Sequence, residues 1–191
     1  MKKTALTLTA LVLAVSAQAQ SSLNTRSSAH TYGLLSLGQG HLNADCSGVQ
    51  ACDRNATGGK AVFGYAFGNG FSLEGGYTNF GKFRASDGAV GLSAKPEALS
   101  FGGAYTAALS PDWGLVARAG VARVRTKLNA EVGTLTGSDS ESKTQPMLGL
   151  AVNYALSPST RIELGVDATR AQYQGERSNV RLVSLGARMA F

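Results

Sequence analysis

The chain has 191 residues, a formal net charge of +6 at pH 7, 24 glycines and only 16% charged residues. This length suits a single domain. The basic residues are scattered and their excess is mild, so the charge excludes a dedicated nucleic-acid-binding protein.

The first 19 residues have the three parts of a secretory signal peptide. Lys2 and Lys3 are basic, residues 4–16 form a short apolar run, and Ala17-Gln18-Ala19 is a cleavage site of small residues. We expect export through the Sec pathway and cleavage after Ala19. A retained anchor helix is the alternative, although the run is short for one. Cleavage leaves 16 basic and 12 acidic residues, a formal charge of +4.

Residues 20–29 are polar and predict a flexible leader before a domain at 30–191. Within that domain, alternating apolar and small or polar residues predict β-strands. The eight predicted strands are 30–38, 59–67, 71–80, 97–109, 114–126, 147–156, 160–173 and 180–191. Gly68-Asn69-Gly70 and two Ser-Pro segments predict tight turns. The predicted long polar loops are 39–57, 81–94, 127–145 and 174–179.

The two faces of the predicted strands differ in side-chain size and polarity. One face carries large apolar residues such as Phe63 and Leu150, and the other carries mostly Gly, Ala, Ser and Thr with isolated charges. A soluble barrel, filled by the second face, would contain voids and unpaired buried charges. In lipid, only a closed barrel satisfies every backbone group. We therefore predict an all-β, eight-stranded antiparallel up-and-down transmembrane β-barrel, with a soluble sandwich as the alternative.

In two of the predicted strands, 30–38 and 114–126, the alternation is interrupted. Leu34 and Leu35 are adjacent, so the facing of 30–38 is ambiguous. Arg123 and Arg125 share the side of the lipid-facing residues, and we expect them to lie beyond the hydrocarbon, near the outer headgroups.

Charged residues of both signs fall on the face predicted to line the lumen. We expect them to pair across the lumen and block a water channel; the alternative is a hydrated lumen with unpaired side chains. Glu74, Arg118 and Glu163 lie well inside their strands and are the best candidates for a central ionic plug. The full predicted network is Lys60, Glu74, Arg118, Arg161, Glu163, Asp167 and Arg188.

The cysteines and histidines give little support for a metal site or for catalysis. Cys46 and Cys52 are close together in an exported chain, which predicts a disulfide; two free thiols are the alternative. His30 and His41 lack metal-ligand spacing to the cysteines. Neither histidine begins a His-x-Ser motif, and no Gly-x-Ser-x-Gly is present, so we expect no enzyme, metal or cofactor.

The last eleven residues, 181–191, alternate strictly and end on Phe191. This segment resembles the final strand of bacterial outer-membrane barrels, whose terminal Phe is recognised by the assembly machinery. The chain as a whole resembles the OmpA-like transmembrane β-barrel family of Gram-negative bacteria. The features that carry this resemblance are the signal peptide, the eight alternating segments, the final Phe191 and residues 64–77 (GYAFGNGFSLEGGY).

The resemblance implies an outer-membrane location, contact with membrane lipid and lipopolysaccharide, and insertion by the barrel assembly machinery. The family's internal Glu–Arg network would map onto Glu74 and Arg118, and less securely onto Glu163. Full-length family members carry a peptidoglycan-binding domain after the barrel; this sequence has none, so no cell-wall tethering is expected.

Two functions fit these patterns. The first is a structural or surface-interaction barrel that has a plugged lumen and acts through its extracellular loops. The alternative is a narrow porin-like channel for ions or small solutes. We expect a monomer with no nucleic-acid partner, and the state of the lumen distinguishes the two functions.

Overall fold

The computed structural model describes residues 28–43, 51–87, 90–132, 135–173 and 176–191. The predicted signal peptide and most of the predicted leader lie outside these residues. Two short strands, β2 (Ala51–Asp53) and β5 (Phe83–Asp87), flank the sheet at one end. The eight barrel strands are β1 (His30–Leu42), β3 (Asn55–Ala66), β4 (Phe71–Asn79), β6 (Val90–Ala108), β7 (Trp113–Val132), β8 (Leu135–Ala155), β9 (Thr160–Tyr173) and β10 (Glu176–Ala190).

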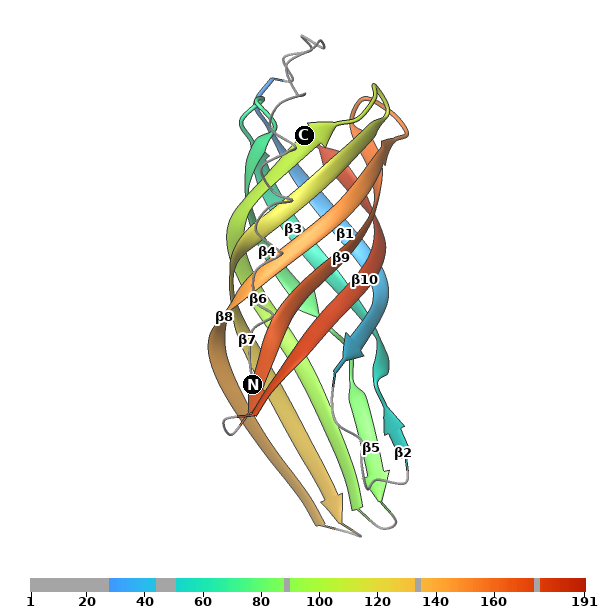
Figure 1. Cartoon of the computed structure of the whole chain (residues 1–191), viewed down its shortest axis with the longest axis vertical. Helices are drawn as coiled ribbons and strands as arrows, with labels where there is room; N and C mark the ends of the chain where they lie inside the picture. The colour runs from blue at the N-terminus through green and yellow to red at the C-terminus, as the bar shows by residue number, and fades with distance from the viewer. Residues whose placement is uncertain (1–27, 44–50, 88–89, 133–134, 174–175) are drawn as a thin grey trace, which may run out of the picture.

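Every barrel strand pairs antiparallel with two neighbours, so the sheet closes on itself (Figure 1). β1 and β10 pair from Tyr32 opposite Ala190 to Leu42 opposite Val180. Closure leaves no edge within the spanning part of the barrel, which is the condition that a bilayer imposes on a sheet. The predicted fold class is confirmed. No helix in the described part of the chain is long and apolar enough to cross a membrane.

The two ends of the barrel differ in the length of their connections. Tight turns connect β3 to β4, β6 to β7 and β8 to β9, and the last residue lies at this end, which we call the short-turn end (Figure 1). In the first turn Gly68 and Gly70 have φ values of 80° and 90°, a backbone conformation that glycine adopts without steric cost. At the other end, the long-strand end, β6, β7 and β8 extend well past their neighbours (Figure 1).

The predicted long loops are wrong over much of their length. β6 begins at Val90, and β7 and β8 continue to Val132 and from Leu135, with Lys127 opposite Ser140. Beyond the bilayer both faces of a strand meet water, so apolar alternation is not needed and polar residues continue the ladder. Likewise β1 continues past Gly38 to Leu42, and β10 begins before residue 180.

The outer wall carries a belt of exposed apolar side chains. Phe63 is 61% exposed and Leu150 is 58% exposed, although both are large. On β1 the ambiguity of facing is resolved, because Leu34 is 1% exposed and Leu35 is 70% exposed. Aromatic side chains contact each other near the short-turn end, for example Phe71 and Tyr105, whose tilted rings have centres 4.8 Å apart. Such a belt is costly in water and is what a barrel in lipid presents.

Candidate functional site in the barrel lumen

Strand alternation directs five charged side chains into the middle of the lumen. They come from β3, β4, β7 and β9 and are largely shielded from solvent. Small residues opposite them leave room. Gly149, for example, faces both Arg118 and Asp167, and a Cβ there would lie 2.5 Å from Asp167 Oδ1. The five residues are Lys60, Glu74, Arg118, Glu163 and Asp167.

Arg118 is the centre of this ionic layer. Its Nε donates to Glu74 Oε2 at 2.8 Å, and its Nη2 donates to Glu163 Oε2 at 3.0 Å. Glu163 Oε1 lies 2.9 Å from the same Nη2 but without hydrogen-bond geometry. Arg118 therefore forms ion pairs with one carboxylate on β4 and one on β9, across the lumen.

Lys60 forms the second half of the ionic layer. Its Nζ donates to Asp167 Oδ2 at 2.5 Å and lies 3.9 Å from Glu163 Oε1. Glu163 thus faces both cations, which joins the two ion pairs into one cluster. Removing either cation would leave a carboxylate buried without its partner.

Tyr32 is a member of the ionic layer that the sequence did not indicate. Its hydroxyl donates to Glu74 Oε1 at 2.5 Å and lies 3.0 Å from Ser72 Oγ. The ring occupies the space where Gly64 lacks a side chain, because a Cβ there would lie 2.3 Å from Tyr32 Cζ. The sequence left the facing of Tyr32 open, because the adjacent Leu34 and Leu35 make the facing of β1 ambiguous. If Leu34 faces inward, Tyr32, two residues before it, faces inward as well.

The structure does not join Arg161 and Arg188 to the ionic layer, although the sequence grouped them with it. Arg188 Cζ lies 3.5 Å from the centre of the Tyr32 ring, and Arg161 Nη1 donates to Asn153 Oδ1 at 3.0 Å. Neither arginine forms an ion pair with an acidic side chain in the described part of the chain. Of the seven residues, five form ion pairs with one another in the structure, and these two lie outside that cluster.

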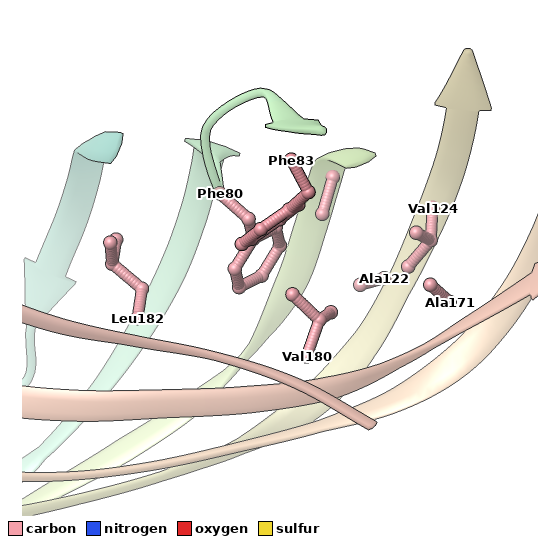
Figure 2. Packing of buried hydrophobic residues seen from close by; sticks show 8 residues of the cluster. Phe80, Phe83, Ala122, Val124, Ala171, Val180 and Leu182 are labelled. Atoms are coloured by element: carbon pink, nitrogen blue, oxygen red, sulfur yellow. The ribbon is translucent and has the colours of Figure 1, made fainter. Parts of the chain in front are cut away.

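An apolar layer fills the lumen between the ionic layer and the long-strand end. The aromatic rings of Phe80 and Phe83 lie beside each other and face side chains from the opposite wall (Figure 2). Phe80 follows β4 directly, and the chain then turns at Gly81, whose φ is 99°. The buried members are Phe80, Phe83, Ala98, Ala122, Val124, Ala171, Val180 and Leu182.

The apolar layer was not predicted from the sequence, although its members lie at lumen-facing positions. Val180 and Leu182, for example, share the side of Arg188 on β10. The charges elsewhere on that face mask the local run of apolar residues on the inner side of the strands.

Other predicted site residues lie away from the lumen. The N–H of Phe191 donates to the carbonyl oxygen of Thr31 at 2.9 Å, so the last residue extends the pairing of β10 with β1. Cys52 lies in β2, and Cys46 lies outside the described residues, so the disulfide stays a prediction. Among described residues, no cluster of three His, Cys, Asp or Glu side chains could hold a metal ion.

Comparison with solved structures shows the same fold in small bacterial barrels. Neisserial surface protein A has 14% identity and a TM-score of 0.61, with 85% of this chain and 99% of that chain covered. Ail, the attachment invasion locus protein of Yersinia pestis, in complex with the heparin analogue sucrose octasulfate, has 18% identity and a TM-score of 0.54, with 85% and 99% covered. OprG from Pseudomonas aeruginosa has 11% identity and a TM-score of 0.55, with 87% and 98% covered.

Sequence comparison identifies the family. No curated protein sequence matches the chain significantly. The family model of the outer membrane protein beta-barrel domain matches residues 7–191, which is nearly the whole chain. The match agrees with the closed eight-stranded sheet, the apolar outer belt and the filled lumen. The chain therefore belongs to the outer membrane protein beta-barrel domain family of Gram-negative bacteria.

Proposed function

We propose that this outer-membrane protein is a non-conducting barrel whose role is structural or lies at the cell surface. In barrels of this kind the short turns face the periplasm, so the long-strand end is extracellular. The observation that carries the proposal is the lumen, in which an ionic layer and an apolar layer lie one beyond the other. β6, β7 and β8 then present a tall extracellular sheet to the outside.

The two layers obstruct ions in different ways. The ionic layer fixes its charges in mutual contacts, as between Arg118 and Glu163, so these groups are not free to hydrate a passing ion. The apolar layer offers no hydrogen-bond partner to water, and hydrophobic constrictions close channels by dewetting. An eight-stranded barrel also has an interior that side chains are able to fill.

The environment of the histidines supports a role other than catalysis. His30 Nδ1 lies 2.8 Å from the Ser28 carbonyl oxygen, and His41 Nδ1 lies 2.8 Å from Asn55 Oδ1. Both contacts are at exposed positions, the first with a residue two positions away and the second with the cross-strand partner of His41. Neither contact activates a nucleophile, which would need a base beside a Ser or Cys side chain.

The conductance of the wild-type protein tests this function. The full chain, refolded in detergent and inserted into planar lipid bilayers, is expected to show no steady porin-size conductance, because both lumen layers are intact. Heat-dependent gel mobility verifies that the inserted protein is folded. A steady conductance from folded protein would instead favour the narrow channel for ions or small solutes.

A basic patch on the outer wall supports a lipid partner. Lys95, Arg123, Arg125 and Lys127 lie on adjacent strands just beyond the apolar belt. Glu97 accepts from Lys95 at 2.9 Å and from Lys127 at 3.0 Å. Burial alone would raise the pKa of Glu97, but these two hydrogen bonds hold it below its usual value.

The two arginines of the basic patch form no ion pair with Glu97 and are available to bind an external anion. Arg123 forms no ion pair among the described residues, and Arg125 donates to Ser140 Oγ at 3.2 Å. Both point outward at the predicted level of the headgroups. We propose that they bind phosphate groups of lipopolysaccharide in the outer leaflet.

A double variant tests the lipid partner. Replacing Arg123 and Arg125 with Gln is expected to remove about 2 kcal/mol of stabilisation by lipopolysaccharide, at about 1 kcal/mol per basic residue near an anionic surface. Unfolding in vesicles with and without lipopolysaccharide measures this difference. Lys82→Gln with Arg84→Gln, exposed on the extracellular side, is the matched control. An equal loss in both double variants would contradict the proposed site.

The proposed function also includes a route of export and of assembly into the membrane. We propose Sec-dependent export, cleavage after Ala19 and recognition of Phe191 by the assembly machinery. The Phe191 side chain is 75% exposed, which supports its availability for recognition. A monomer suffices for this architecture, because the barrel closes within one chain.

A further inference from the structure

The short-turn end of the lumen opens into a cavity of about 460 Å³. This cavity, which we call the vestibule, is lined by Arg161 and Arg188 together with Asn153, His30 and the turn residues. None of the described residues that line it is acidic. Its volume falls within the range of small-molecule sites.

Arg161 and Arg188 occupy directly opposed positions in the vestibule wall. They are cross-strand partners in the pairing of β9 with β10, and both face the lumen. Like charges directly opposite each other destabilise a sheet. Asn153 orients the Arg161 guanidinium and the Tyr32 ring supports that of Arg188, so both are held in place without a counterion from the described residues.

The charge balance of the lumen leaves a surplus of positive charge at the short-turn end. Lys60 and Arg118 face three carboxylates, those of Glu74, Glu163 and Asp167, which leaves the ionic layer one negative charge. Arg188 lies over the ring of Tyr32, whose hydroxyl binds Glu74, and its positive charge compensates this negative charge. The positive charge of Arg161 then has no counterpart among these lumen residues.

A second observation points to a missing ligand. Asn153 is fully buried in the vestibule wall, and its Nδ2 donor has no hydrogen-bond partner among the described residues. Buried donors without a partner are rare in native structures. The wall therefore holds two guanidinium groups and a spare amide donor, and all of these favour an acceptor with negative charge.

We propose that the vestibule binds a small phosphate-class oxyanion between Arg161 and Arg188. Guanidinium groups bind phosphate oxygens through paired, charge-assisted hydrogen bonds. A phosphate group has oxygens enough to accept from both guanidinium groups at once, and its negative charge meets the uncompensated charge of Arg161. The ligand is either free inorganic phosphate or a phosphate ester of the periplasm, and it enters from the short-turn end.

Calorimetric titration of the full chain in zwitterionic detergent at low ionic strength tests the site. Inorganic phosphate and glycerol 3-phosphate are the two probes, and the tighter of them identifies the source. We expect saturable binding of one phosphate per chain that sodium chloride of equal ionic strength does not reproduce. Equal heats with sodium chloride would overturn the proposal.

Variants on one strand locate the site. Arg161→Gln is expected to weaken binding about tenfold or more, from the loss of charge-assisted hydrogen bonds. Arg170→Gln, on β9 but facing outward, is the matched control and leaves the affinity unchanged. Equal affinities for wild type and R161Q, or an equal loss in R170Q, would overturn the assignment.

Two further measurements separate binding from folding. Arg161→Lys keeps the charge but loses the planar fork, so its affinity is expected to lie between those of wild type and R161Q. Without phosphate, the Tm of R161Q should equal or exceed that of wild type, because an opposed like charge is removed. Phosphate should raise the Tm of wild type and not that of R161Q; a rise in both would contradict the site. These results do not depend on whether the lumen conducts.

Discussion

Replacing Arg118 with methionine is expected to lower the free energy of unfolding by about 3–5 kcal/mol, the range for breaking a buried ion pair by removing one partner. The change leaves Glu74 and Glu163 buried without the cation that they share. Urea unfolding in phospholipid vesicles, followed by tryptophan fluorescence, measures the difference. Trp113, at the start of β7, is the single tryptophan and reports on the barrel.

Two controls assign this loss to the ionic layer. Arg123→Met removes the same charge on the same strand, but from the outer wall, and is expected to cost far less. Combining Arg118→Met with Glu74→Gln and Glu163→Gln removes the stranded charges and should recover much of the lost stability. If R118M and R123M unfold at the same urea concentration, the ionic layer does not stabilise the barrel as argued.

Sequence alternation indicates which charged side chains of the ionic layer face the lumen. A strand has a period of two, so Glu74 on β4 and Arg118 on β7 had to face the side opposite Leu73 and Ala117. Charges of both signs on one face of a closed barrel then have partners within reach. Arg161 lies outside the ionic layer, because parity gives the face of a residue but not its height in the lumen relative to an acid.

Other features had no signal in the apolar pattern. The polar continuation of β7 and β8 beyond the membrane is stabilised by cross-strand backbone bonds, and these are possible for nearly any sequence of residues. Tyr32 was hidden because Leu34 and Leu35 together break the alternation of β1. Phe83 lies in a segment that was predicted as a loop, and it joins the apolar layer after the turn at Gly81, whose positive φ a hydropathy pattern does not reveal.

The apolar layer is expected to be a second, independent seal, and Phe80→Ala tests it. Phe80 is fully buried among side chains from several strands, so the truncation should cost about 3–5 kcal/mol, as Phe-to-Ala changes in cores do. Leu92→Ala, at an exposed site on β6 beyond the membrane, is the control and should change stability by less than about 0.5 kcal/mol.

Conductance measurements on variants show whether each layer closes the lumen by itself or whether one layer alone does so. With either layer intact the lumen stays closed, so F80A and R118M are each expected to be silent in planar bilayers. Combining Phe80→Ala and Val180→Ala with Arg118→Met weakens both layers and should give a measurable ion conductance. Val180 is chosen because it belongs to the same buried cluster as Phe80. If R118M alone conducts as well as the combined variant, the apolar layer does not close the lumen, and the ionic layer is its one barrier.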